Sequence, residues 1–185
     1  MAKTDPDIDL LPGLREGEES ALGHLMDRHL KTVTAIGYYM LGDASLAEDV
    51  AQTTFLKFWQ VAPKWEPGRA TILTWMRRVA TNDCLDRLRK KGPIYSDQVP
   101  DQADTTETAL EELEKNDTID AVRRALSNLP DTQRAAITLS YYQHLSQKEG
   151  AAILGQSVKA YESLLSRARK NLKAALSPWV ERETI

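Results

Sequence analysis

Apolar side chains recur at helical spacing along almost the whole chain, and no segment alternates apolar and polar residues as a half-buried strand would. Glycine or proline stands at the breaks in this pattern, for example at Gly42 and at Pro67-Gly68. The sequence therefore predicts an all-α protein. The expected helices cover residues 8–15, 20–40, 45–61, 71–91, 109–129, 132–142, 146–154 and 158–176.

A polar and acidic stretch separates these helices into two groups. Residues 92–108 contain few apolar side chains, which is typical of a linker and not of a packed core. A length of 185 residues suits one or two domains. The sequence thus predicts two helical domains, at 1–91 and 118–185, joined by an acidic flexible linker at 92–117.

Charge is distributed in blocks, although the formal net charge is only −3. Residues 69–91 carry seven Lys and Arg against two Asp, residues 93–117 carry eight acids against one Lys, and residues 157–173 carry five bases against one Glu. Basic blocks suit a phosphate backbone, whereas an acidic block would be repelled by it. Each block is equally compatible with the solvated face of a helix, so charge alone leaves both interpretations open.

The last two helices have the spacing of a helix-turn-helix. Ser146 and Glu149 fit a capping box, and a short turn at 155–157 precedes the final helix. An ordinary helical hairpin would show the same spacing. One side of the final helix is an apolar stripe of Tyr161, Leu165, Ala168 and Leu172. The opposite side carries groups suited to base edges and phosphates, namely Lys159, Glu162, Ser163, Ser166, Arg167 and Lys170.

Motifs in the second half resemble region 4 of bacterial sigma factors, the domain that reads the −35 promoter element. The residues that carry this resemblance are Leu129-Pro130-Asp131-x-Gln133-Arg134, Leu145-Ser146-x-x-Glu149, Ile153-Leu154-Gly155 and Ser166-Arg167-Ala168-Arg169-x-x-Leu172. The resemblance implies that the six polar-face residues of the final helix form the −35 DNA-binding set.

Two motifs in the first half are similar to parts of sigma region 2. The helix that grips the polymerase clamp is similar to the segment Ala47-Glu48-Asp49-Val50-x-Gln52-x-x-Phe55-Leu56-x-x-Trp59. The part of region 2 that opens and reads the −10 element is similar to three further segments, Trp65-x-Pro67-Gly68, Trp75-x-x-Arg78-Val79-Ala80-x-Asn82 and Asp86-x-Leu88-Arg89. This implies that Glu48, Asp49, Gln52, Thr53 and Leu56 bind core polymerase. It also implies −10 DNA binding by Trp65, Arg69, Arg78, Asn82, Arg87, Arg89 and Lys90, whereas Trp75 is expected in the core.

The order of the motifs and the absence of a domain between them resemble the extracytoplasmic-function group of sigma factors. This resemblance implies an alternative sigma factor that binds the β′ clamp helices and the β flap of core RNA polymerase, recognises promoter DNA and melts it. It further implies a stress or envelope response controlled by an anti-sigma factor, often membrane-attached, and no cofactor, metal or small-molecule substrate. The chain shows neither a run of about 18 apolar residues nor a signal-peptide core, so a cytoplasmic protein is expected.

Other functions fit the sequence less well. The histidines, His24, His29 and His144, are scattered without metal-ligand partners at useful spacing, and no phosphate-binding glycine loop is present, so an enzyme is not expected. A helix-turn-helix repressor or activator would not need the basic, aromatic block at 47–89. A sigma-mimicking adaptor should lack the basic cluster at 87–91.

Four positions are notable within this pattern. Gly150 stands inside a helix where the family usually has a bulky aliphatic residue, at a cost of roughly 1 kcal/mol in helix propensity. Glu162 and Leu164 stand where the family is often basic, which leaves the −35 sequence open. Cys84 is expected to be a packing residue; a redox sensor is the alternative.

Overall fold

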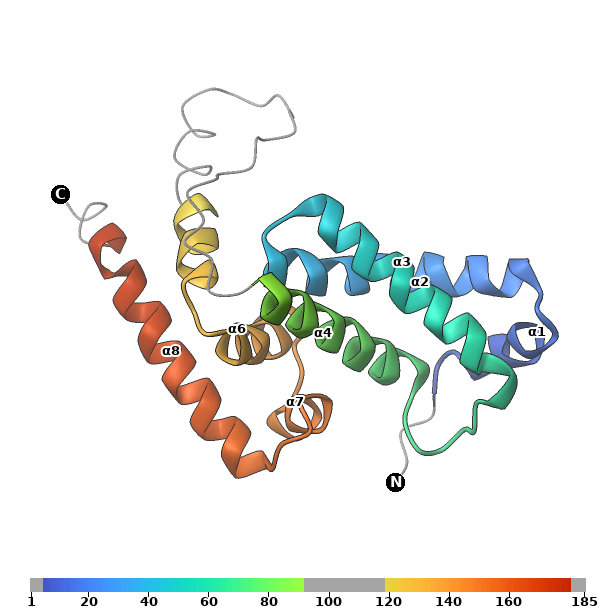
Figure 1. Cartoon of the computed structure of the whole chain (residues 1–185). Helices are drawn as coiled ribbons and strands as arrows, with labels where there is room; N and C mark the ends of the chain where they lie inside the picture. The colour runs from blue at the N-terminus through green and yellow to red at the C-terminus, as the bar shows by residue number, and fades with distance from the viewer. Residues whose placement is uncertain (1–4, 92–118, 181–185) are drawn as a thin grey trace.

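The computed structural model describes residues 5–91 and 119–180, and within these ranges every regular element is a helix or helical turn (Figure 1). The prediction of an all-α fold in two helical units is confirmed. The linker expected at 92–117 lies outside the described residues, as does the part of the helix expected at 109–129 that precedes residue 119.

The helices of the first half begin and end within a residue or two of the predicted positions. They are η1 (Ile8–Leu10), α1 (Leu11–Glu16), α2 (Glu19–Leu41), α3 (Ala44–Val61), η2 (Ala62–Lys64) and α4 (Ile72–Lys91). Gly17 and Gly42 follow α1 and α2 with φ of 76° and 72°, in the left-handed region that glycine adopts without strain. The side chain of Asp43 begins α3 by accepting a hydrogen bond of 2.9 Å from the N–H of Leu46.

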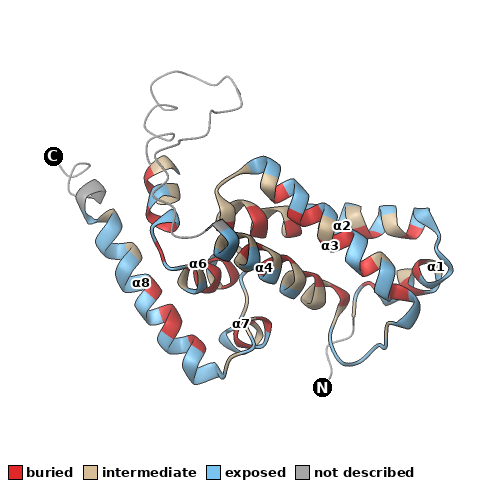
Figure 2. Cartoon of the chain, in the orientation of Figure 1, coloured by how far each residue is buried: buried red, intermediate tan, exposed pale blue. Residues whose placement is uncertain are grey.

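A continuous apolar core joins α2, α3 and α4. Leu25 and Ile36 of α2, Phe58 of α3 and Met76 of α4 are fully buried in it. Figure 2 shows that the buried positions lie on the sides of the helices that face one another. Cys84 belongs to the same core, which confirms that it is a packing residue.

The second half forms a second apolar core around the helix-turn-helix, and this core touches the first through Ala135 of α6 and Tyr39 of α2. Its elements are the helix 119–127, α6 (Asp131–Ile137), the π-helical turn η3 (Thr138–Tyr142), α7 (Gln147–Ile153) and α8 (Val158–Val180). Ile137 of α6 and Tyr161 and Leu165 of α8 are almost completely buried together. The predicted capping box is present, since Ser146 and Glu149 each bond the other's backbone N–H.

Two boundaries in this half differ from the prediction. The helix expected at 132–142 is α-helical only to Ile137 and then widens into η3, closed by a 3.0 Å hydrogen bond from Gln143 N–H to Thr138 O. The last helix is expected to end at Leu176, before Pro178, but α8 extends to Val180. The helical backbone thus continues for two residues beyond the proline that is expected to stop it.

The presence of glycine at position 150, inside a helix, has a steric reason that helix propensity does not reveal. A Cβ atom at this position would lie 2.4 Å from the Cζ and hydroxyl oxygen of Tyr161. The Tyr161 ring is fully buried, and its hydroxyl donates a 3.1 Å hydrogen bond to the carbonyl of Ala136. The glycine therefore makes room for the largest buried side chain of the second core.

Arg134 of α6 links the two halves of the chain, which pack directly against each other. Its guanidinium donates hydrogen bonds to the carbonyl oxygens of Met40 at 2.7 Å, Ser127 at 2.5 Å and Leu129 at 3.2 Å. The residue is only 8% exposed, and burial lowers its pKa, although arginine remains charged in proteins. Three carbonyls, one from the first half, therefore surround a buried charge.

Further links between the halves come from Arg123, whose guanidinium donates to the hydroxyl of Tyr38, and from Gln143 and Tyr142 at the end of η3. The Gln143 side chain donates to the carbonyl of Thr32 on α2 and accepts from Nε of Arg77 on α4, both at 3.2 Å. The Tyr142 ring stacks on Tyr39 with centroids 3.5 Å apart. Together with the Arg134 contacts, these links form what we call the docking interface.

Gly150→Ala should lower the free energy of unfolding by about 1–3 kcal/mol, because the added methyl group collides with the fixed Tyr161 ring. Chemical denaturation measures this directly. The matched control is Gly23→Ala on α2, where an added Cβ meets nothing within 4 Å and should raise stability by roughly 0.5–1 kcal/mol. Stabilisation by both substitutions would contradict the steric account.

Candidate nucleic-acid and polymerase interfaces

The residues predicted to bind polymerase lie on one side of α3. Glu48, Asp49, Gln52 and Leu56 are exposed and Thr53 is half-buried, while the opposite side of the helix packs in the core. This follows from spacings of three and four residues, which bring side chains to the same helix face. Leu56 is 52% exposed between acidic and amide groups, a mixture that suits a protein partner better than DNA.

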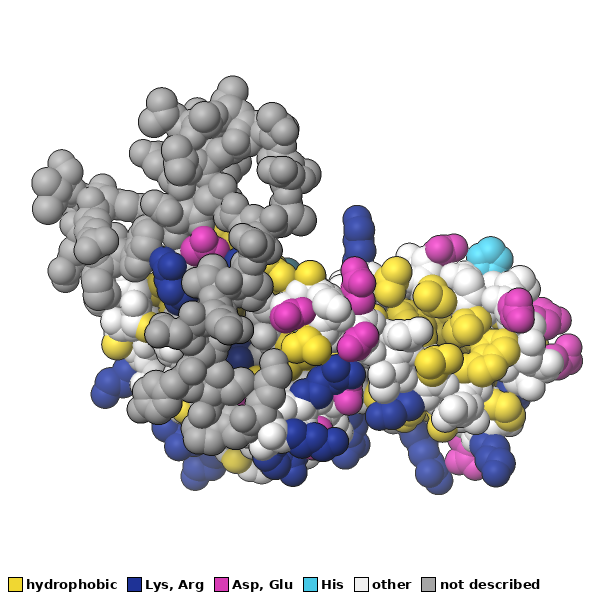
Figure 3. Space-filling view, turned by 45° about the horizontal axis from the view of Figure 1, so that its top comes forward, with side chains coloured by type: hydrophobic (Ala, Val, Ile, Leu, Met, Phe, Trp, Pro, Cys, Tyr) yellow, Lys and Arg dark blue, Asp and Glu magenta, His cyan; other side chains and the backbone are white. Residues whose placement is uncertain are grey.

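The first domain presents further apolar side chains near this helix. Leu30 of α2 is 42% exposed. In Figure 3 hydrophobic side chains gather over the first half of the chain, with Asp and Glu side chains at the edges of the gathering. Exposed apolar patches edged by polar side chains are typical of surfaces that contact another molecule.

Arg87 connects the predicted polymerase face with the predicted DNA helix. Its guanidinium lies 3.0 Å from the carboxylate of Asp83 on its own helix and 3.6 Å from that of Asp49 on α3. Its side chain is 28% exposed. Arg87 therefore holds α3 against α4, a role that sequence spacing did not indicate, and only part of its charge faces solvent.

The remaining −10 candidates on α4 lie on its solvent side. Arg78 and Asn82 are exposed one turn apart, and Arg89 and Lys90 are exposed towards the end of the helix. Asp86 lies one turn after Asn82 and pairs with Arg89 at 2.7 Å. Arg78 is thus an exposed base beside Asn82, whereas Arg89, further along the helix, is paired with Asp86.

Trp65 and Trp75 form an aromatic cluster with Phe58 beside the start of α4. The three rings meet edge to face, with centroids 5.4 to 6.0 Å apart. Trp75 packs against the core, as predicted. Trp65 is half-buried, and its Nε1 is buried without a hydrogen-bond partner among the described residues. Its place in a base pocket stays a prediction, while its packing role is a structural fact.

Arg69 lies in the loop between η2 and α4. It is 87% exposed in its side chain and forms a 3.5 Å ion pair with Glu66 of the same loop. Such an exposed pair contributes little to stability, so the arginine can exchange this partner for a phosphate at small cost.

All six −35 candidates are exposed on α8, and the predicted apolar stripe packs in the second core. Leu164 is buried as well, so the departure from the family at this position belongs to the core and not to the DNA-facing side. Nε of Arg167 donates to the carbonyl of Ser163 at 3.3 Å. Its terminal amino groups make no hydrogen bond within the described residues.

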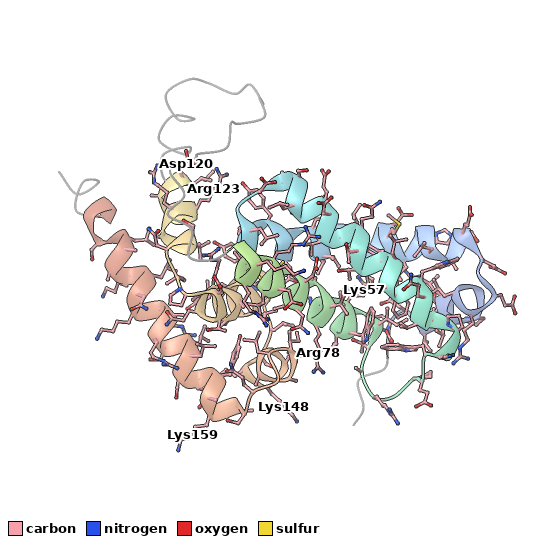
Figure 4. The ribbon with its side chains drawn as sticks, in the orientation of Figure 1. Lys57, Arg78, Asp120, Arg123, Lys148 and Lys159 are labelled. Atoms are coloured by element: carbon pink, nitrogen blue, oxygen red, sulfur yellow. The ribbon has the colours of Figure 1, made fainter. Side chains whose placement is uncertain are left out.

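Lys148 is an exposed base that the sequence reasoning missed. It lies in the first turn of α7, the helix that crosses the DNA backbone in helix-turn-helix docking. In Figure 4 Arg78, Lys148 and Lys159 point outward from α4, α7 and α8 along the same edge of the molecule. The position of Lys148 two residues after the helix cap was the signal that could have identified it.

Within the described ranges, no three His, Cys, Asp or Glu residues come together as a group that could hold a metal ion. Nor is any described helix both long and apolar enough to cross a membrane.

Two family models match the chain over most of its described length. Residues 25–94 match Sigma-70 region 2, and residues 119–172 match Sigma-70, region 4. The ECF RNA polymerase sigma factor RpoE of Cereibacter sphaeroides is 33% identical over 181 residues, covering 92% of this chain and 94% of the relative. The chain belongs to the extracytoplasmic-function sigma factors.

Further relatives agree with this assignment. The ECF RNA polymerase sigma factor SigW of Bacillus subtilis is 30% identical over 178 residues, covering 88% of this sigma factor and 92% of SigW. Among solved structures, CnrH in complex with the cytosolic domain of CnrY is 28% identical with a TM-score of 0.69, covering 94% of this chain and 99% of CnrH. RpoE of Bartonella quintana, solved with the anti-sigma factor NepR, has the same fold at 23% identity, with a TM-score of 0.67 over 84% of this chain and 96% of RpoE.

The Cys84 thiol of this sigma factor should not react in the native protein. Burial, with a smaller contribution from Asp83, raises its pKa to about 12, so that the thiolate is scarce at pH 8. Mass spectrometry after iodoacetamide treatment at pH 8 should find native protein unmodified and urea-unfolded protein fully modified. Rapid modification of the native protein would restore the redox-sensor hypothesis.

Proposed function

We propose that this sigma factor works in the cytoplasm as a promoter-recognition subunit. The exposed side of α3 binds the β′ clamp helices of core RNA polymerase, and the second domain binds the β flap. The loop at 65–71 and the solvent side of α4 open and read the −10 element. The solvent side of α8 reads the −35 element.

The observation that supports this proposal most is the arrangement at the start of α4. Capture of unstacked bases requires positive charge beside aromatic surface and a group that can bond base edges. Arg78 supplies the charge, and Asn82 supplies amide donors and acceptors one turn away. Trp75, three residues before Arg78 on α4, brings the ring of Trp65 to the same part of the helix. Extruding a base costs a few kcal/mol, which such a fitted site must offset.

The docked arrangement of the two halves cannot contact both promoter elements at once. Elements centred about 25 base pairs apart are separated by about 85 Å along straight duplex, at about 3.4 Å per base pair. The halves touch through the docking interface, and α4 and α8, with 20 and 23 residues, are about 30 and 35 Å long, which even together is less than this separation. The chain must therefore open at this interface before it acts on a promoter.

Control by an anti-sigma factor follows from the family and fits this arrangement. CnrH, whose structure is similar over 94% of this chain, binds the cytosolic domain of another protein. A protein bound across α2 and α3 would cover the polymerase-binding side and the apolar side chains beside it. Release of that partner would then connect a stress or envelope signal to transcription.

Asn82→Ala should reduce promoter opening about fivefold or more while leaving polymerase binding unchanged, because a lost base contact costs about 1–3 kcal/mol. Permanganate footprinting measures opening, and a pull-down with core polymerase measures binding. Leu56→Ala is the reciprocal variant, since it removes exposed apolar surface from α3 and should weaken polymerase binding. Equal losses in both assays for Asn82→Ala, or no loss in either, would contradict the −10 role.

Arg167→Ala should relax the preference at one base pair of the −35 element. The terminal amino groups of Arg167 can bond guanine O6 and N7 together, a contact worth about 1–3 kcal/mol of discrimination. Lys173→Ala, further along α8, should instead weaken all promoters similarly and reduce the salt slope by about one, because a lysine there touches phosphate.

Transcription from a promoter library with a randomised −35 region separates these two effects. If the Arg167→Ala protein keeps the base preference of the unmodified chain, Arg167 does not read the sequence, and its bond to Ser163 is then its main role.

A further inference from the structure

The loop at 65–71 has little packing of its own. Residues 66–70 are all exposed, and Gly68 adopts a φ of 97°, which gives the backbone a conformation that other side chains rarely adopt. A loop of this kind is not fixed by its own side chains. Its position is determined by the groups that hold its two ends.

Both ends are held by side chains from the segment before α2. Nη2 of Arg15 donates a 2.6 Å hydrogen bond to the carbonyl of Trp65, where the loop begins. The N–H of Ile72, where α4 begins, donates a 2.8 Å hydrogen bond to Oδ2 of Asp5. The carboxylate of Asp5 thus acts as an additional cap on α4, beside the cap that Thr71 gives to the N–H of Thr74.

A buried carboxylate anchors this segment to α2. Asp7 is 1% exposed, and its Oδ2 lies 2.7 Å from Nε2 of His29. Its Oδ1 accepts a 3.1 Å hydrogen bond from Arg28, which also binds Asp9 through two bonds. The N–H of Asp7 donates to Oδ1 of Asp5 at 3.1 Å, so the anchor fixes the carboxylate that caps α4.

We infer that residues 5–15 position the −10 reading loop, with Asp5 and Arg15 as the positioning residues. This inference rests on the proposed function of the loop and of α4. The segment precedes residue 25, where the match to Sigma-70 region 2 begins. Both contacts are made to the loop backbone, so they fix its path whatever side chains it presents to DNA.

Asp5→Ala and Arg15→Ala should each reduce promoter opening about fivefold without changing polymerase binding. This is the effect expected when one helix cap, or an equivalent hydrogen bond, is lost. The measurement is permanganate footprinting with the full chain and core polymerase, beside a pull-down and a thermal unfolding curve. Asp5→Asn retains an acceptor oxygen and should open the promoter normally. Glu16→Ala is the charge-matched control, because Glu16 is exposed on α1 and has no bond to either end of the loop.

Normal opening by the Asp5→Ala protein would overturn the inference. Equal losses of opening and polymerase binding would also overturn it, because the segment would then only hold the domain together. The Asn82→Ala protein, tested in parallel, separates this inference from the proposed function. If the Asn82→Ala protein opens the promoter normally, the proposed site is refuted. If the Asn82→Ala protein is impaired in promoter opening and the Asp5→Ala protein is not, only the positioning role is refuted.

Discussion

The arrangement of this molecule depends on a buried guanidinium. Arg134 brings its positive charge into the contact between the halves, where it is matched by the carbonyl oxygens of Met40, Ser127 and Leu129. Its Nε has no partner within the described residues, which carries a cost of about 1–3 kcal/mol for an unsatisfied buried group. The halves are therefore held by polar bonds that are not fully satisfied, beside the Tyr39–Tyr142 stack and the burial of Ala135 in the first core. An unsatisfied buried group at the centre of this contact suits an interface that must open.

This contact also connects the functional surfaces of the two domains. Gln143, which follows η3, bonds Arg77 of α4, and Arg77 lies next to the proposed DNA-reading residue Arg78. Arg87 joins the same helix to Asp49 on the proposed polymerase side of α3. The proposed polymerase side of α3, the proposed DNA-reading side of α4 and the docking interface are thus joined by direct side-chain contacts.

Much of the fold could be predicted from the sequence because it depends on local rules. Helical periodicity, the glycines after α1 and α2 and the capping box of α7 all act within a few residues. Contacts between distant residues could not be predicted in this way. The collision that requires Gly150, the partner of Arg134 on α2 and the Asp5 cap on α4 join positions that no periodic pattern relates. The same limit applies to the sites, since spacing put the candidates on exposed sides but did not reveal that Arg87 is paired or that Trp65 is half-buried.

The measurement that tests the central claim most directly is a gel-shift titration on the promoter upstream of the chain's own gene, with and without core RNA polymerase. A sigma factor whose halves are docked, and whose net charge is −3, should bind the duplex weakly alone and strongly once polymerase is present. Tight, sequence-specific binding by the isolated chain, unchanged by polymerase, would contradict the account and would instead indicate a helix-turn-helix repressor.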